Sequence, residues 1–344
     1  MASYRDRCRE KSSAITDFKK VYLDTKYWVI LRDVHRGICR DKEKVELYDL
    51  VMRLSESENV IFPFSEVLFE EFLKQTDPES LESTLHLVYK LSKNTAICNY
   101  SHRNQTELEI MFRFLHDDIS ADNDYNVICT RDVWTCVPYA WGKFTVKESK
   151  PDDGSYDKKL QNVLFNNGMA LKIYLEQLRS DSEFVKSYPD PSEKILQRQK
   201  HSNGKHINKI LEDEFFFELK ERKKNVLQSM SNTFKSFTVD NANSMFYQLI
   251  EMKKSGELKY FIPSINIYST ICATWIISQN KKIIINDHFD MMHASAALPY
   301  FDMFLTEKSL CHLLNSIIPK HLPFINAKVC ADISYAIEEL SKIE

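Results

Sequence analysis

Acidic residues lie beside four apolar segments that have the character of strands, two near the start of the chain and two near its end. The segment 21–23 is followed by Asp24, the segment 60–64 by Glu66, Glu70 and Glu71, the segment 283–285 by Asp287 and Asp290, and the segment 303–306 by Glu307, with Asp302 at its start. The carboxyl ends of parallel strands meet at one edge of a sheet, so we expect these side chains to share a cleft. Crowded carboxylates either take up protons or bind a cation, and an oxygen donor set without cysteine selects Mg²⁺ or Mn²⁺. The pattern therefore predicts metal-dependent hydrolysis of a phosphodiester.

Each of these acids also has a purely structural explanation. Asp24 and Asp287 suit the N-caps of the helices that follow them. Glu70, four residues after Glu66, suits an exposed helix face. Glu307 suits a first helical turn, where the helix dipole favours an acid. The order of the acids along the chain therefore carries more weight than any single residue.

Hydrophobic periodicity predicts the elements that would position these acids. Short apolar runs predict strands over 20–23 and 59–64, and helical spacing predicts helices over 43–54, 66–75 and 78–91. This β-α-α-β-α order is typical of an α/β fold with a parallel sheet. The C-terminal third predicts a buried helix over 263–278, a helix rich in small residues over 287–298, a strand over 302–306, a helix over 307–315, and a final strand and helix within 324–343.

The middle of the chain, from about 95 to 260, is mainly helical in pattern. Its basic residues Lys194, Arg198, Lys200, Lys205 and Lys209 suit a solvated face better than contact with a phosphate backbone. Three consecutive aromatics, Phe215 to Phe217, favour packing over stacking with bases, because they cannot all reach one helix face. Packing is also favoured for His293, over a role in contacting phosphate or moving a proton.

Composition excludes several other classes of site. The 344 residues include only 6 glycines, and these are too dispersed for a Walker loop, a dinucleotide-binding loop or a hydrolase nucleophile elbow. The 8 cysteines contain no C-x-x-C pair, which favours free thiols in a reducing compartment. The net charge of −3 argues against a surface that is basic throughout. No apolar segment is long enough to cross a membrane, so we expect a cytoplasmic protein.

Four motifs together resemble the PIN-domain-like superfamily of metal-dependent nucleases. Val21-Tyr22-Leu23-Asp24-Thr25 is similar to the family's first strand, which ends in Asp-Thr or Asp-Ser, and 64–72 is similar to its second motif, in which a serine precedes a helical glutamate. Residues 290–298 resemble the third motif, an aspartate followed by small residues, and 300–307 resemble the fourth, a strand that ends in threonine and an acid. The matches cover the two ends of the chain and leave out the middle.

The resemblance implies an α/β fold with a PIN-like central parallel sheet flanked by helices and with a large, mainly helical insertion. Residues 1–95 would form the N-terminal part of the PIN-like domain, residues 96–260 the insertion, and residues 261–344 the C-terminal part. It also implies a nuclease that uses Mg²⁺ or Mn²⁺ and acts on nucleic acid, RNA in preference to DNA. A regulatory protein partner and a homo-oligomer are compatible with this family, and a membrane partner is not expected.

Site roles follow from the same resemblance. Asp24 and Asp290 would hold the principal metal ion, and Glu71 and Asp302 would complete the set of catalytic carboxylates. Ser65 and Thr306 would orient the carboxylates through their hydroxyl groups.

Two assignments stay open at this stage. Glu66 is an alternative to Glu71, and Glu307 is an alternative to Asp302, because the family commonly has an aspartate where this chain has Lys308. The same departure leaves open a second function, a catalytically silent module that binds RNA or a protein partner.

Overall fold

Four parallel strands form the central sheet of the computed structural model, which describes residues 4–57, 59–115, 128–130, 136, 192–202, 204–233, 238–257, 262–278 and 284–343. The strands are β1 (Lys19–Leu23), β2 (Val60–Ile61), β5 (Met303–Leu305) and β6 (Lys328–Cys330), in the spatial order β2-β1-β5-β6. Tyr22 on β1 is opposite Phe304 on β5, so strands from the two ends of the chain pair at the centre of the sheet. The predicted α/β class with a parallel sheet is confirmed.

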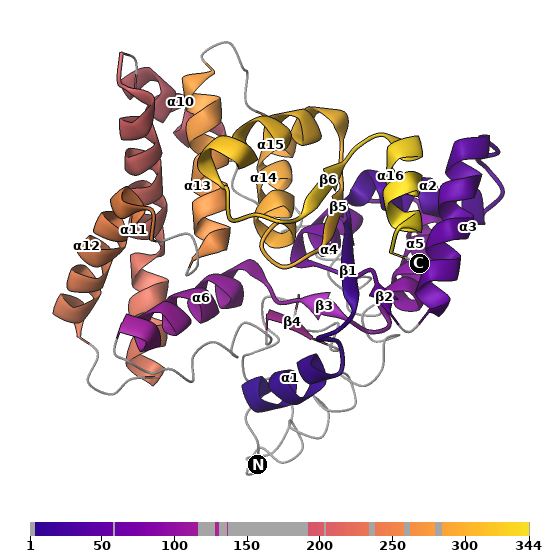
Figure 1. The fold of residues 1–344 in the computed structure, drawn as a ribbon, viewed down its shortest axis with the longest axis horizontal. Helices are drawn as coiled ribbons and strands as arrows, with labels where there is room; N and C mark the ends of the chain where they lie inside the picture. Colours follow the sequence, from indigo (N-terminus) through magenta and orange to yellow (C-terminus); the bar gives the residue numbers. More distant parts are fainter. Residues whose placement is uncertain are drawn as a thin grey trace.

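Helices cover this sheet and bury it (Figure 1). They are α2 (Thr25–His35), α3 (Lys42–Glu56), α4 (Glu66–Leu73), α5 (Pro78–Ser92), α14 (Ile285–Ala297), α15 (Lys308–His321) and α16 (Ile333–Ser341), while α1 (Tyr4–Ser13) packs beside Thr130. Val21, Tyr22 and Leu23 are at most 1% exposed, as expected for a strand covered on both faces. The predicted helices α3, α4, α5 and α14 lie within a few residues of their expected bounds.

Side-chain caps explain where several of these helices begin. The side chains of Asp24, Asp41, Ser65 and Asp77 each accept a hydrogen bond from a backbone N–H in the first turn of the following helix. Helix α2 therefore starts at Thr25, directly at the end of β1, and this places its first turn at the carboxyl edge of the sheet.

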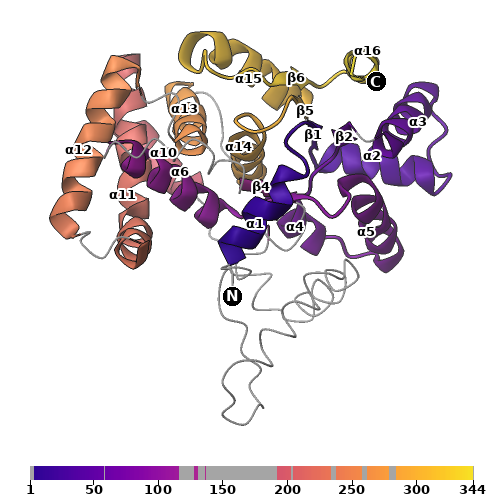
Figure 2. The ribbon, with the colours of Figure 1, turned by 60° about the horizontal axis from the view of Figure 1, so that its bottom comes forward.

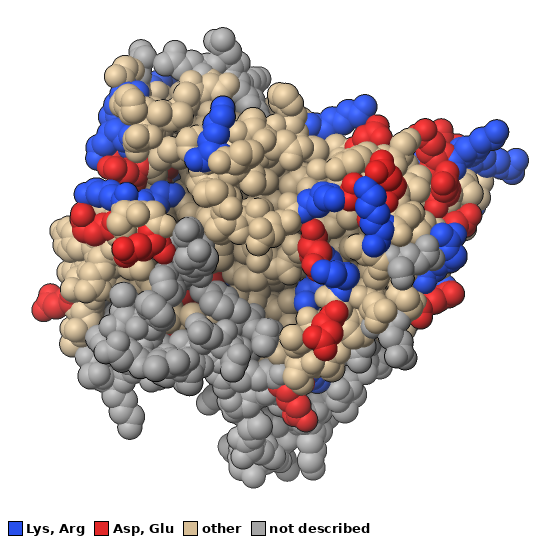
Figure 3. Space-filling view, viewed as in Figure 1, with Lys and Arg blue, Asp and Glu red and all other residues tan. Residues whose placement is uncertain are grey.

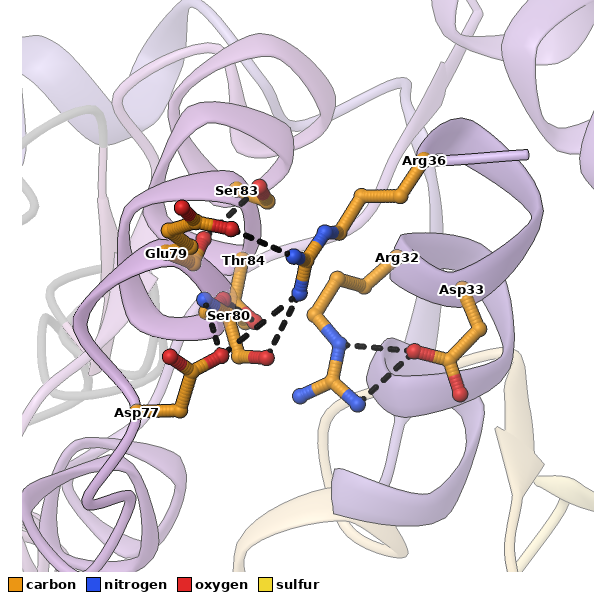
Figure 4. Close-up of polar contacts among 8 residues, drawn as sticks. All are labelled: Arg32, Asp33, Arg36, Asp77, Glu79, Ser80, Ser83 and Thr84. Carbon is orange, nitrogen blue, oxygen red and sulfur yellow. Dashed lines mark hydrogen bonds and ion pairs between the residues drawn. The ribbon is translucent and has the colours of Figure 1, made fainter. Parts of the chain in front are cut away.

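An arginine joins the end of α2 to the start of α5 (Figure 4). The guanidinium of Arg36 donates to Oγ of Ser80 at 2.7 Å and to Oε2 of Glu79 at 3.0 Å, and it lies 3.7 Å from Asp77. Arg32, one turn earlier, donates instead to its neighbour Asp33. These contacts hold the two helices together on the side of the sheet that carries β2.

The middle of the chain adds a helical layer with a hydrophobic core of its own. Its described elements are β3 (Ala96–Ile97), α6 (Tyr100–Leu115), β4 (Cys129–Thr130), α10 (Ser192–His201), α11 (Ile207–Thr233) and α12 (Val239–Ser255). Residues of α6, α11 and α12 pack against Ile262 and Ile265, at the start of α13 (Pro263–Ile277). Figures 1 and 2 show α13 and α14 between this layer and the sheet. Residues 137–191 of the predicted insertion lie outside the described part of the chain.

The layer is continuous with the main body at both ends. Ala96, Ile97 and Cys98 belong to the same core cluster as β1, and Phe64 bridges Ala96. The later part of α13, from Ile267 onward, also packs in that core. The two cores therefore share α13, the fully buried helix that the sequence predicts over 263–278.

One predicted strand is wrong. Ile284 and Ile285, expected to end a strand over 283–285, instead cap and begin helix α14. Ile283 lies outside the described residues. Asp287 and Asp290 are thus carried by the helix itself: Asp287 accepts a hydrogen bond from the backbone N–H of Ile284, and Asp290 reaches the site through the packing of α14 against α4 and α13.

The surface carries both signs of charge. On the face shown in Figure 3, basic and acidic side chains are intermixed over the outer helices, and the middle of that face has few charged groups. None of the helices in the described ranges has the length and apolar character needed to cross a bilayer. All eight cysteines are free thiols.

Candidate metal centre

A buried histidine connects the elements that form the candidate site. His293 on α14 is 3% exposed. Its Nδ1 lies 2.7 Å from the hydroxyl oxygen of Tyr22 on β1, and its Nε2 lies 2.8 Å from Oε2 of Glu71 on α4. The Tyr22 hydroxyl also lies 2.6 Å from Oγ of Ser65, and the hydroxyl of Thr25 donates to Glu71. Five side chains from both ends of the chain therefore form one network at the carboxyl end of β1.

The network favours a charged pair. Burial by itself lowers the pKa of His293, but the hydrogen bond to Glu71 and the negative charges of Glu71, Asp24 and Asp290 outweigh burial and raise it. Burial would raise the pKa of Glu71, and the contacts with His293 and Thr25 reverse this and lower it. The protonated form of His293 is thus stabilised beside an ionised Glu71.

Two further carboxylates interact electrostatically with the same histidine. Burial raises the pKa of Asp24 to about 6, with Glu307 adding to the shift and His293 opposing it. Burial raises the pKa of Asp290 to about 7, and here too His293 opposes the shift while Glu307 and Asp24 add to it. Since Asp24 and Asp290 act on each other and on His293, they lie on the same side of the molecule. One imidazolium does not neutralise this group of acids, so the site retains unrelieved negative charge.

The position of Glu66 differs from that of Glu71. The carboxylate of Glu66 accepts a hydrogen bond of 2.5 Å from the backbone N–H of Tyr100, at the start of α6. Burial raises its pKa to about 7, opposed by the charge of Arg103. Of the two alternatives left open by the sequence, the structure brings Glu71 to His293 and turns Glu66 toward α6.

The two predicted hydroxyl residues have different surroundings. Thr306, fully buried at the end of β5, helps to hold down the pKa of Asp24, although its hydroxyl forms no hydrogen bond of standard geometry with the described residues. Ser65 caps α4 by accepting from Leu68 N–H at 3.2 Å, and it contacts Tyr22 rather than a carboxylate. Its expected role in orienting carboxylates is therefore indirect, through Tyr22 and His293.

Asp302 does not join the other carboxylates. It precedes β5, where it lies 2.9 Å from Nζ of Lys19 and accepts a hydrogen bond from the backbone N–H of Lys20. Four residues of extended strand separate Lys20 from Asp24, or about 13 Å. The expectation that Asp302 completes the site is corrected, because it occupies the amino end of the strands. Glu307, at the carboxyl end, is exposed and lies at the N-terminus of α15.

A second acidic group lies in the helical layer. Potential ligand atoms of Glu214, Glu218 and Cys272 all lie within 4.8 Å of one another, and among the described residues no other three histidines, cysteines or acids, those around His293 included, bring their ligand atoms that close together. Arg198 lies 3.2 Å from Glu214 and 4.0 Å from Glu218, and Arg222 also binds Glu218. Because two guanidinium groups already balance the two carboxylates, we interpret this group as a buried ion cluster.

Four of the five basic residues singled out in the middle region form ion pairs, and Lys200 is exposed. Lys194 lies 3.6 Å from Glu221, and Lys205 and Lys209 lie 2.9 and 3.0 Å from Asp213. Arg198 stacks on the ring of Phe217 at 3.9 Å. The structure thus agrees with the favoured interpretation of these residues as a packed and solvated face.

Sequence reasoning missed the bridging residues of the site. Tyr22 and Thr25 lie beside Asp24 in the sequence but were not assigned roles, and the sequence favoured a packing role for His293. A tyrosine within a fully apolar strand is a usable signal, because a buried phenol needs a hydrogen-bond partner. The partner itself, 271 residues away, is visible only in the fold.

Comparison with known proteins finds no match among family models, curated proteins or solved structures.

Proposed function

We propose that this protein is a PIN-like nuclease that depends on Mg²⁺ or Mn²⁺ and cleaves nucleic acid, RNA in preference to DNA. The observation that carries the proposal is that His293 binds Glu71 and lies within the electrostatic reach of Asp24 and Asp290. These acids come from segments at opposite ends of the chain; Asp24 is buried, and Glu71 and Asp290 are half-buried. The preference for RNA rests on the resemblance of the four motifs alone.

The donor set fits a hard divalent cation. Asp24 and Asp290 would hold the ion, with Glu71 beside them and Glu307 at the exposed edge. All of these donors are carboxylate oxygens, the ligands that Mg²⁺ and Mn²⁺ prefer. Burial raises the pKa values of Asp24 and Asp290, and a bound dication would favour the ionised forms that burial disfavours, which supports this assignment. When bound, such an ion polarises a phosphoryl oxygen and makes water more acidic.

The protein's own side chains would fix the carboxylates in place. Thr25 and His293 hold the carboxylate of Glu71 from two directions, and Tyr22 holds the ring of His293. Asp24 is held by the backbone N–H of Tyr27 at 3.3 Å. With both its nitrogens in hydrogen bonds to buried groups, His293 would act as a positioning residue and as a source of positive charge.

A catalytically silent binding module is the second candidate, and one observation favours it. The imidazolium of His293 already supplies a positive partner for Glu71, and the absence of Asp302 from the site leaves Glu307 as the fourth acid. In such a module, the network would stabilise the fold and the surface around it would bind RNA or a protein without cleavage.

An assay of cleavage with defined metals separates the two candidates. Labelled single-stranded RNA and DNA are incubated with the full chain in Mg²⁺, in Mn²⁺ and in chelator, alongside Asp24→Asn, Asp290→Asn and the control Asp49→Asn on the exposed face of α3. The nuclease proposal expects metal-dependent cleavage by the wild type and the control, and its loss in both site variants. Equal cleavage by all four proteins, or none by the wild type, rejects it.

A further inference from the structure

A lysine lies beside the carboxylate site without forming an ion pair there. Lys74 is the C-cap of α4, one helical turn beyond Glu71, and its side chain is exposed. Residues three apart on a helix share a face, so Lys74 and Glu71 project from the same side of α4.

The ammonium group is held by an aromatic ring. Nζ of Lys74 lies 3.5 Å from the centroid of the Phe289 ring, and Phe289 is 2% exposed. The contact holds the lysine against α14, and the charge of Glu71 on α4 acts on it there. A cation over a ring face gains about 0.5–1 kcal/mol at an exposed position, enough to favour one placement of a flexible side chain.

Electrostatics agree with this placement. Partial burial lowers the pKa of Lys74, and the charges of Glu71 and Glu70 oppose that shift. The charge of Lys74 in turn helps to lower the pKa of Glu71. Yet across the described residues no carboxylate lies within 4.0 Å of its Nζ, whereas Lys194, Lys205 and Lys209 each have one.

We propose that Lys74 binds a phosphate group of the nucleic-acid backbone next to the one held at the carboxylate site. The proposal rests on the function proposed above and identifies a substrate contact of that same site. A ring face leaves the N–H donors of the ammonium group available on its open side, where an anion can accept them. A phosphate drawn to a metal ion must also approach several acids, and a cation at the rim offsets that repulsion.

The competing explanation is that Lys74 serves only as a counter-charge for Glu70 and Glu71. The two explanations differ in what Lys74→Gln changes. Loss of a phosphate contact weakens nucleic-acid binding and reduces its dependence on salt, because fewer counterions are released. Loss of a counter-charge alone changes metal affinity and melting temperature and leaves nucleic-acid binding unaltered.

The test measures binding separately from cleavage. Fluorescence anisotropy of a labelled single-stranded RNA is recorded in chelator at several salt concentrations for the wild type, Lys74→Gln, Lys74→Arg and the control Lys90→Gln, an exposed lysine on α5. We expect Lys74→Gln to bind about 3–10-fold more weakly, with a log–log salt slope smaller in magnitude by about 0.7. Lys74→Arg should retain most of the affinity, and Lys90→Gln should match the wild type.

Kinetics complete the test. With Mn²⁺ present, Lys74→Gln should raise KM more than it lowers kcat. Equal RNA affinity, salt slope and KM for Lys74→Gln and wild type overturn the inference, as does a wild-type chain that binds no RNA. Failure of the proposed function has a different result, namely a wild type without metal-dependent cleavage or an active Asp24→Asn.

Discussion

The imidazole of His293 joins helices α4 and α14 through a contact of 2.8 Å between its Nε2 and Oε2 of Glu71, two residues separated by 222 positions in the chain. On its other side the ring contacts the Tyr22 hydroxyl. The ring therefore links the second and third acidic segments to the central strand, and the geometry of the carboxylates depends on it.

Replacing His293 with alanine is expected to lower the free energy of unfolding by about 2–4 kcal/mol. The change leaves the Tyr22 hydroxyl and the Glu71 carboxylate buried with one partner fewer, and unpaired buried groups are costly. Urea unfolding at pH 7 measures the difference. His312→Ala, on the exposed face of α15, is the matched control, and equal costs for the two variants contradict the assigned role of His293.

Asp290→Asn should stabilise the metal-free protein at alkaline pH. The pKa of Asp290 is raised from 3.8 to about 7, so the stability that its protonated form contributes is present below pH 4 and is lost as pH rises through about 7. The free energy of unfolding of the asparagine variant should therefore exceed that of the wild type by about 2 kcal/mol at pH 8 and match it near pH 4. Unfolding in chelator across this pH range is the measurement. A difference in stability that does not vary with pH would show that folding does not raise the pKa of Asp290.

A bound divalent metal ion should stabilise the protein by favouring the ionised carboxylates of the site. Mn²⁺ at about 100 times its dissociation constant adds about 2.7 kcal/mol to the stability of a single-site protein. We expect a rise in the melting temperature of the wild type and little or none for Asp24→Asn. The readout is thermal unfolding with Mn²⁺ and with chelator, and Ca²⁺ serves as a comparison ion. An equal rise in both proteins would place the binding elsewhere.

Asp302→Asn should leave metal-dependent activity unchanged. Asp302 pairs with Lys19 at the amino end of the strands, and both side chains are substantially exposed. Loss of such an exposed pair costs about 0–1 kcal/mol. Glu307→Gln, at the carboxyl end, is expected to weaken the response to Mn²⁺. If the two variants behave in the opposite way, Asp302 reaches the site in a form of the protein that differs from the one described.

Arg198→Met should destabilise the helical layer by about 3–5 kcal/mol, because it leaves Glu214 and Glu218 buried with less positive charge beside them. Burial raises the pKa of these carboxyls to about 7 and 8, and the charge of Arg198 opposes both shifts. Zn²⁺ should not stabilise the wild type through this cluster. Unfolding with and without Zn²⁺ tests both points, and Zn²⁺-dependent stabilisation that Cys272→Ser abolishes would favour a metal site instead.

The sequence by itself determined the local structure around the site. Caps at Asp24, Ser65 and Asp77 and the apolar spacing of 43–54 and 78–91 act over a few residues, so the helices they predict are found in place. The strands of the central sheet were also predicted, because a run such as 21–23 must be buried in any fold, whereas β3 and β4 were not. The apolar run 283–285 was misread, since short apolar runs suit a helix start as well as a strand.

Only the tertiary structure decided which acids meet. Asp302 precedes and Glu307 follows the same short strand, so the two acids lie at opposite ends of the sheet. Which of these ends carries the other acids depends on the direction of the neighbouring strands. Glu66 and Glu71 lie on one short helix, and its rotation about its axis sends one toward Tyr100 and the other toward His293. Periodicity cannot fix that rotation, because it depends on contacts with α14 and α6, which are distant in sequence and adjacent only after folding.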